Sequence, residues 1–232
     1  MRKAELARLV ASYKPSDQVL TAMGQIKVLA TVGPSASGKT TVMKALLKQS
    51  TDFGFILDET TRSARPGEKD GIDWLFRSVD EVVADARRGE LVQLAIGPNG
   101  DLYATRLSSY PSNKTGLIGL VPAAVEEFRR LPFDKFGAAF IVPDSYEKWR
   151  AWLAKHAKDS GWTDEKLAGR LAEAKQSYEF ALGDKEMRFV LNDEAEKAAQ
   201  RLQQVSLSQA PADEARARAI AEANYQKLQA GL

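Results

Sequence analysis

The chain has no cysteine and a single histidine, His156, among its 232 residues. Without thiols it can form neither disulfides nor cysteine nucleophiles, and one histidine excludes a multi-histidine metal site. Its apolar runs are short, and none approaches the roughly 20 residues that a membrane-spanning helix needs. The first residues also lack the apolar segment of a secretory signal. We therefore expect a cytoplasmic protein that contacts no membrane.

Neither sign of charge is in large excess. The 33 basic and 31 acidic residues leave a net charge of +2, so no strong overall field favours nucleic acid, and we predict no nucleic-acid partner. Apolar residues make up 44% of the chain, which is ordinary for a globular protein with a sizeable core. The length suits one α/β domain with an insertion.

A phosphate-binding loop follows the first apolar run, residues 26–32. Residues 33–40 match the pattern G-x-x-x-x-G-K-[ST] between an expected strand and an expected helix. Glycines let the backbone N–H groups turn toward phosphate oxygens, and the helix start adds partial positive charge. We expect Lys39 to reach the β- and γ-phosphates of ATP and the Thr40 hydroxyl to bind Mg²⁺. The predicted ATP-binding residues of this segment are Gly33, Pro34, Ser35, Ala36, Ser37, Gly38, Lys39, Thr40 and Thr41.

Strands alternate with helices through most of the chain, which predicts a mostly parallel sheet flanked by helices. Residues 1–24 are expected to form a helical extension that packs outside the core. Residues 25–57 and 111–206 form the predicted core, and Asn192 is expected to cap its last helix. Residues 58–110, with two turn signals and several short strands, form an inserted subdomain. Residues 207–232 are expected to form a solvated terminal helix.

Several motifs in this order resemble the guanylate kinase family. Residues 60–74 resemble its T-T-R-x-x-R-x-G-E-x-x-G-x-D-Y signature, 89–93 its G-E-F-[IL]-E segment, 102–105 its Y-Y-G-[ST] and 190–193 its closing V-N-D. The resemblance covers residues 27–202. It implies an ATP-dependent nucleoside monophosphate kinase of the P-loop NTPase fold, with a subdomain for the monophosphate and a helical lid at about residues 150–172.

The resemblance also implies roles for individual residues. Arg62 and Arg65 would grip the acceptor phosphate, for which paired guanidinium forks are well suited. Arg170, in the lid, would stabilise charge on the transferred phosphoryl group beside Lys39. Asn192 would lie at the ATP. The remaining implied substrate contacts are Asp58, Trp74, Gln93, Tyr103 and Thr105.

The chain departs from the family pattern mainly where the base is read. Gln93 replaces the glutamate that reads the base and offers one acceptor and one donor, and Asp58 replaces a serine at the end of the second strand. An ionised carboxylate would repel guanine O6 but suits an amino group or a hydroxyl that loses its proton. Gly119 and Val121 replace two strand-end aspartates, a change that bears on rate as well as specificity. Trp152 and His156 stand at two arginine positions of the lid.

Three functions stay open from the sequence. The first is a guanylate-kinase-type enzyme acting on GMP, dGMP or another nucleoside monophosphate. The second is a phosphosugar or modified-nucleotide kinase, like the family's relative that acts on ribose 1,5-bisphosphate, with Asp58 or Glu59 as general base. The third is a non-catalytic nucleotide-binding module, which the intact Gly38-Lys39-Thr40 disfavours. The sequence does not fix the oligomeric state and allows a homodimer.

Overall fold

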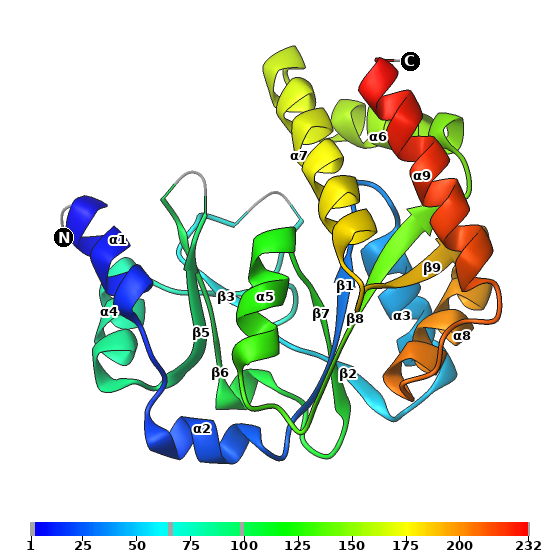
Figure 1. The fold of residues 1–232 in the computed structure, drawn as a ribbon. Coiled ribbons are helices and arrows are strands. Elements are labelled where there is room, and N and C mark those ends of the chain that lie inside the picture. Colours follow the sequence, from blue (N-terminus) through cyan, green and yellow to red (C-terminus); the bar gives the residue numbers. More distant parts are fainter. Residues whose placement is uncertain (1–2, 65–66, 98–99, 232) are drawn as a thin grey trace. The chain divides into compact units, whose positions relative to one another are not determined.

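The structure is a computed structural model that describes residues 3–64, 67–97 and 100–231. The chain divides into two compact units (Figure 1). Unit 1 consists of Met1–Lys27, Gly54–Gly116 and Phe128–Lys135. Unit 2 consists of Val28–Phe53, Leu117–Glu127 and Phe136–Leu232. Each unit therefore contains segments that are far apart in the sequence.

A five-stranded sheet carries the phosphate-binding loop. Its strand order is β2-β7-β1-β8-β9, and β8 and β9 pair in parallel. The strands are β1 (Lys27–Val32), β2 (Phe53–Phe55), β7 (Thr115–Gly119), β8 (Lys135–Pro143) and β9 (Arg188–Asn192). Helices flank the sheet, so the predicted α/β class with a mostly parallel sheet is confirmed.

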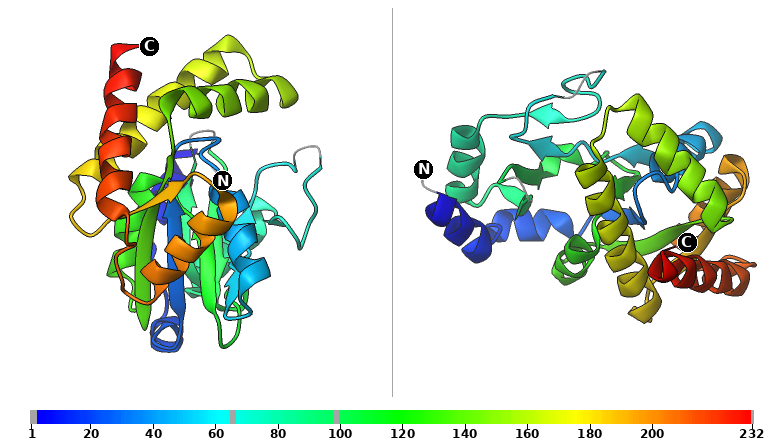
Figure 2. Two further views of the ribbon diagram at one scale, coloured as in Figure 1. Left: turned by 90° about the vertical axis from the view of Figure 1, so that its right-hand side faces the viewer. Right: turned by 90° about the horizontal axis from the view of Figure 1, so that it is seen from above.

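Side-chain alternation along β8 explains how helices cover both faces of the five-stranded sheet. Ile141 joins a buried cluster with α3 (Lys39–Gln49) and α8 (Ala195–Ser206), which lie side by side in Figure 2. Its neighbour Phe140 points the other way and contacts Tyr178 of α7 (Asp164–Gly183), with ring centroids 5.0 Å apart. Successive strand residues face opposite sides, so a continuous apolar run fits a doubly covered strand.

The C-terminal helix α9 (Glu214–Ala230) is packed rather than solvated, and the expectation of a solvated tail is wrong. Ala217, Ala221 and Asn224 are buried, and Asn224 donates to the carbonyl oxygen of Pro143 at 3.0 Å. Lys227 pairs with Glu147 of α6 (Tyr146–Asp159) at 2.5 Å. Small alanines let α9 lie close to its neighbours, a property that the weak periodicity of its sequence concealed.

Unit 1 is built on a four-stranded sheet of order β4-β3-β6-β5. Its strands are β3 (Glu59–Thr60), β4 (Leu75–Phe76), β5 (Leu91–Ile96) and β6 (Leu102–Arg106). One face packs on α4 (Val79–Arg88), and α1 (Lys3–Ser12) adds Leu6 to the same apolar cluster. Three helical segments complete the part of the chain that the structure describes: α2 (Asp17–Met23), the short 3₁₀ turn η1 (Leu107–Ser109) and α5 (Pro122–Arg130).

Local residues define both ends of helix α4. Ser78 caps it in a reciprocal capping box with Glu81, and Gly89 ends it with a left-handed φ of 69°. The first helical segments also form as expected, and Ser16 caps α2 by accepting from the Val19 amide. The N-terminal helices α1 and α2 fall in unit 1.

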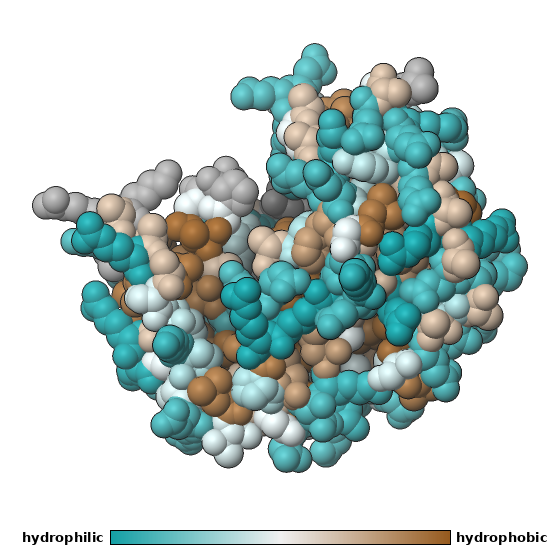
Figure 3. Space-filling view, in the orientation of Figure 1, coloured by the Kyte–Doolittle hydropathy of each residue, from teal (hydrophilic) through white to brown (hydrophobic). Residues whose placement is uncertain are grey.

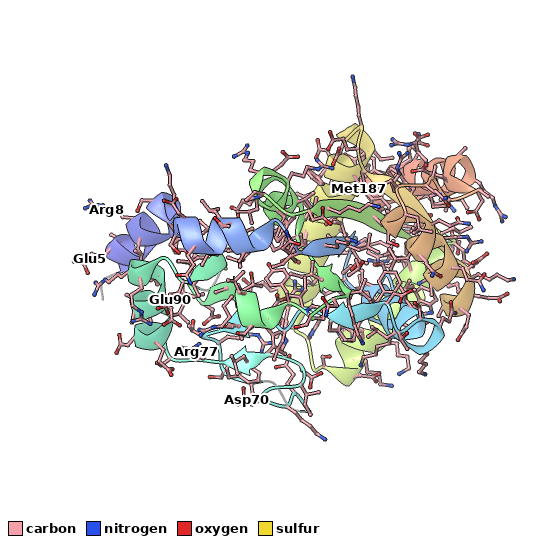
Figure 4. All side chains as sticks on the ribbon, turned by 90° about the horizontal axis from the view of Figure 1, so that it is seen from below. Glu5, Arg8, Asp70, Arg77, Glu90 and Met187 are labelled. Atoms are coloured by element: carbon pink, nitrogen blue, oxygen red, sulfur yellow. The ribbon has the colours of Figure 1, made fainter. Side chains whose placement is uncertain are left out.

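Four charged side chains form a buried network on the α4 face of this sheet. Glu59 is fully buried and accepts hydrogen bonds from Arg77, at 2.9 Å, and from Arg106. Asp85 accepts from the same two arginines at 3.1 and 2.5 Å. Arg77 is labelled in Figure 4 at the start of α4. Two carboxylates and two guanidinium groups balance in charge, which is what makes their burial tolerable.

Hydrophilic residues predominate over the outer sides of α7 and α9 on the face drawn in Figure 3. Among the described residues, the structure contains no helix that is both long and apolar enough to cross a membrane.

The charge network predicts an asymmetric response to mutation in unit 1. Arg106→Met leaves the carboxylates of Glu59 and Asp85 buried with a single shared guanidinium partner, so we expect unit 1 to lose about 3 kcal/mol of unfolding free energy. Arg88→Ala, which removes a half-exposed partner of Asp85, should cost under about 1 kcal/mol. Urea unfolding followed by circular dichroism measures both, and equal losses would contradict this account.

Candidate active site

The phosphate-binding loop joins β1 to α3, and two of its glycines lie so close to neighbouring atoms that a Cβ would crowd them. Gly33 has a φ of 147°, and a Cβ there would lie 3.0 Å from the Ile141 carbonyl oxygen and from Ser37 Oγ. Gly38 has a φ of 90°, and a Cβ there would lie 2.3 Å from Asn192 Nδ2. Both positions require glycine for conformation and for space.

Lys39 lies over this loop and is bound to its backbone. Its Nζ donates to the carbonyl oxygens of Gly33 at 2.7 Å and Pro34 at 2.9 Å. Burial, and then the positive charge of Arg170, lowers the pKa of Lys39 to about 8. The ammonium group is therefore poised for an anion, because polyphosphate oxygens would replace the lost hydration of the charged form.

Two side chains from elsewhere in unit 2 hold the loop. Asn192, the last residue of β9, donates from Nδ2 to the Ser37 carbonyl oxygen at 2.9 Å. The expectation that Asn192 caps the last helix is wrong, because Glu194 is the N-cap of α8 and gives no side-chain cap. Trp149 of α6 is fully buried and donates from Nε1 to the Ser35 carbonyl oxygen at 2.9 Å.

Trp149 was missed at the sequence level. The apolar spacing of Tyr146, Trp149 and Leu153 predicts a buried helix face, and these residues do form a cluster with Ala174. No local signal shows that the indole N–H reaches a loop 114 residues earlier in the chain. The cluster also includes Ala36 of the loop, so α6 and the loop are packed together as well as hydrogen-bonded.

Arg170 projects from α7, the second helix of the predicted lid. It pairs with Glu173 at 2.5 Å, and its guanidinium carbon lies 5.6 Å from the centroid of the Trp162 ring. Its charge acts on Lys39, so the two residues predicted as catalytic share one electrostatic environment. His156 packs edge-on against Trp162, and Lys148 lies over Trp152 at 5.1 Å, so both departures from the lid pattern have packing roles.

The loop has the groups that a nucleoside triphosphate with Mg²⁺ would need. Ser37 Oγ is buried and has no hydrogen-bond partner in the described part of the chain, which leaves it available to a ligand. Thr40 is exposed in the first turn of α3. The described residues contain no group of three or more metal-ligating side chains, so Mg²⁺ would bind through Thr40, phosphate oxygens and water.

In unit 1, the strand registers bring the predicted substrate residues onto one face of the sheet. Gln93 pairs with Thr105, and Glu59 pairs with both Ala104 and Leu75. Asp58 precedes Glu59, so the same registers place it between Thr105 and Trp74 on the neighbouring strands. The 2.9 Å hydrogen bond from the Leu75 amide to the Asp58 carbonyl oxygen agrees with this placement. Laterally adjacent residues share a face. Trp74, Asp58, Thr105 and Gln93 therefore form one lateral row across four strands, in that order.

The next row on the same face includes Tyr103 and Phe76, which lie two residues further along their strands. Trp74 and Tyr103 meet edge to face, with centroids 5.7 Å apart. Arg62 lies over the Trp74 ring at 5.0 Å and over the Phe76 ring at 5.6 Å. The residues therefore form an aromatic platform with a guanidinium group above it, beside a row of polar groups. The opposite face is the one packed on α4.

Arg62 is bound to Glu68 by two parallel hydrogen bonds of 2.6 and 2.7 Å, and this partner raises the pKa of Arg62. The geometry is that of a guanidinium fork holding a carboxylate, which is also the geometry for a phosphate. Arg65, the second predicted arginine of the clamp, lies outside the described residues.

Asp58 and Glu59 differ sharply although they are adjacent. Glu59 is fully buried on the α4 face with two arginines, so the option that it acts as general base is wrong. Asp58 is half-buried on the other face, and no side-chain hydrogen bond or ion pair joins it to another described residue. Burial raises the pKa of Asp58 to about 7.

The two family aspartates missing from the end of β7 leave no substitute carboxylate at their positions. At Gly119, a Cβ would lie 3.9 Å from Thr31 Oγ1, so a larger residue would meet only ordinary contacts. Val121 is 66% exposed, unusual for an apolar side chain. The structure gives no physical account of why valine stands there.

The glycine-shaped loop, its lysine and the α/β core define a P-loop nucleotide-binding protein. Comparison with known proteins narrows this class. The guanylate kinase family model matches residues 25–209. A guanylate kinase of Lactococcus lactis is 32% identical over 178 residues, covering 75% of this chain and 83% of that protein. A guanylate kinase of Schizosaccharomyces pombe is 29% identical over 192 residues, covering 79% and 92%.

The chain belongs to the guanylate kinase family. Its fold also resembles the crystal structure of guanylate kinase from Anaplasma phagocytophilum, with a TM-score of 0.55 and 22% identity over 80% of this chain and 86% of that one. The matched region ends before α9, so the terminal helix that packs on β9 and α7 is additional to it.

Gly38→Ala tests the shape of the loop. The added methyl would meet Asn192 Nδ2 and force a left-handed φ on alanine, so we expect at least tenfold weaker binding of ATP–Mg²⁺ by isothermal titration calorimetry. Gly183→Ala is the matched control, since its Cβ would meet nothing within 4 Å and its φ is not left-handed. Equal affinity in both variants would refute the assignment.

The lowered pKa of Lys39 predicts that ATP affinity depends on pH. Below pH 8 the side chain is charged and attracts the triphosphate, whereas above pH 8 it is increasingly neutral, so the Kd for ATP–Mg²⁺ should rise. Arg170→Met removes a charge that lowers this pKa, so the rise should then begin at a higher pH. A Kd that stays constant from pH 7 to about 9.5 in the parent protein would contradict the prediction.

Proposed function

We propose that this protein is an ATP-dependent nucleoside monophosphate kinase of the guanylate kinase type, with GMP or dGMP as the first acceptors to test. Membership of the family carries the reaction class, and the rows of site residues in unit 1 support an acceptor that pairs a planar base with a phosphate. We place the enzyme in the cytoplasm, and a homodimer remains a prediction.

The donor half of the proposal uses the loop of unit 2. Backbone N–H groups of residues 33–40 would hold the phosphates of ATP, with Lys39 toward the β- and γ-phosphates. Asn192 and Trp149 position the loop through its carbonyl oxygens. Mg²⁺, when bound at Thr40, supplies charge neutralisation on the phosphates. Arg170 would stabilise the charge that develops on the transferred group.

The acceptor half uses the site face of unit 1. Arg62 would exchange Glu68 for the acceptor phosphate, because both partners offer two oxygens to the same fork. Arg65 and Tyr103 would contact the same phosphate. The base would lie along Asp58, Thr105 and Gln93, with Trp74 beside them.

The reaction needs no general base. An oxygen of the acceptor phosphate, already anionic, attacks the γ-phosphorus of ATP while the bond to the β-phosphate oxygen breaks. The products are ADP and a nucleoside diphosphate. Positioning and charge neutralisation supply the rate enhancement in such transfers.

One observation favours a second candidate. A carboxyl with a pKa of about 7 suits proton abstraction at neutral pH, so Asp58 could serve as general base toward a hydroxyl acceptor such as a phosphosugar. A coupled ADP-release assay with nucleoside monophosphates and phosphosugars separates the two functions. Turnover on phosphosugars alone would replace the first candidate by the second.

Arg62→Ala tests the phosphate clamp. Loss of the fork should raise the KM for GMP at least tenfold and lower kcat, while the affinity for ATP–Mg²⁺ stays unchanged. The matched control is Arg87→Ala, because Arg87 is an exposed arginine on α4 of the same unit. Unchanged GMP kinetics in Arg62→Ala would remove Arg62 from the acceptor site.

A further inference from the structure

Asp58 occupies the centre of the polar row in unit 1, yet it has no side-chain partner among the described residues. Its neighbours in the row are Thr105 and Trp74, and Gln93 lies one strand further on. Thr105 is nearly fully buried and shares a 3.0 Å hydrogen bond with Tyr110. Partial burial without a cationic partner favours the protonated form of a carboxyl in such a row.

Within the described part of the chain, three arginines of unit 1 are bound by carboxylates other than Asp58. Arg77 and Arg106 lie on the opposite face of the sheet and are bound by Glu59 and Asp85. On the same face, Arg62 is bound in both hydrogen bonds of its fork by Glu68. Tyr110 also senses Asp58, since its pKa is raised by burial and, to a smaller extent, by the charge of Asp58.

We propose that Asp58 reads the acceptor's base as a neutral carboxylic acid, donating its proton in a hydrogen bond to a carbonyl oxygen such as O6 of guanine. This inference rests on the proposed function and deepens it by assigning Asp58 the protonation state in which it determines specificity for a base with a carbonyl at that edge. It also removes the conflict between an aspartate at this position and guanine.

The protonation state of Asp58 decides which edge of a nucleobase can form hydrogen bonds with the row of residues that contains it. A neutral carboxyl has one O–H donor, as the serine hydroxyl of the family pattern does, and can serve O6 in the same way. Gln93 in the same row supplies an amide with one acceptor and one donor, which complements the adjoining part of the base. The ionised carboxyl has only acceptors, so it would repel O6 and prefer an exocyclic amino group.

The state of Asp58 makes recognition depend on pH. Since burial raises its pKa to about 7, the donor form is present below pH 7 and is lost as the pH rises through 7. The kcat/KM for GMP should therefore fall by up to tenfold per pH unit above pH 7. Two other groups titrate in the same assay: Lys39 and the acceptor phosphate, whose second pKa is near 6. Their effects on kcat/KM must be removed from the comparison.

The experiment measures kcat/KM for GMP from pH 5.5 to about 9 in the parent enzyme, Asp58→Ser and Asp58→Asn. Dividing the parent value by the Asp58→Ser value at each pH removes the titration of substrate and of Lys39, which both enzymes share. We expect this ratio to be constant below pH 6.5 and to fall above pH 7. Asp58→Asn always keeps a donor, so its own ratio to Asp58→Ser should stay constant.

Three outcomes would overturn the inference. A ratio that is constant over the whole range shows that Asp58 does not titrate against the base. A ratio that rises with pH, together with better turnover of AMP than GMP, shows that the ionised form reads an amino group. Absence of turnover with every nucleoside monophosphate in the parent enzyme rejects the proposed function as well, and is distinguished from misfolding by retained ATP–Mg²⁺ binding.

Discussion

Close backbone packing at the phosphate-binding loop is the constraint on which unit 2 depends. Gly38 lies against Asn192 with no space for a Cβ, and a Cβ at Gly33 would make a tight contact of 3.0 Å with the Ile141 carbonyl oxygen. The loop is therefore fixed by β8 and β9, strands that come more than 90 residues later in the chain. Hydrogen bonds from Asn192 and Trp149 to loop carbonyl oxygens use the acceptor side of the backbone. Lys39 adds a positive charge to the same loop, and backbone N–H groups at the start of α3 can turn toward an anion, so charge and backbone together favour phosphates.

Unit 1 separates its charges between the two faces of one sheet. The α4 face carries two carboxylates and two guanidinium groups that neutralise each other in the interior, where an unpaired charge would destabilise the fold. The other face carries Arg62 with its single carboxylate partner and Asp58 with none among the described residues. Because register places alternate residues on opposite faces, Glu59 and Asp58 are adjacent in sequence but have unrelated roles. The structural network thereby leaves the site face with groups that a ligand can recruit.

Sequence patterns predicted the regular elements well where the pattern itself supplies the physics. Ser78, Ser145 and Thr163 are the N-caps of helices α4, α6 and α7, and their side chains accept from backbone amides as such residue types do. Predictions failed where a polar side chain had two plausible partners. Asn192 bonds the loop and not the helix after it, and Glu59 joins arginines and not a substrate. A separate failure is α9, which packs through alanines that carry little periodic signal. In each case a distant segment decided the outcome.

By itself, the sequence determined the chemistry that is available: a G-x-x-x-x-G-K-T loop, an arginine-rich turn, and an aspartate and a glutamine where the base is read. These follow from residue types and local spacing, and they sufficed for the fold class and the reaction class. Only the tertiary structure decided which groups meet. Strand register aligned Trp74, Asp58, Thr105 and Gln93 across four strands, and it left Asp58 half-buried with no cationic partner among the residues that the structure describes. The protonation state of a carboxyl depends on its solvation and its neighbours, and both are properties of the folded chain rather than of its sequence pattern.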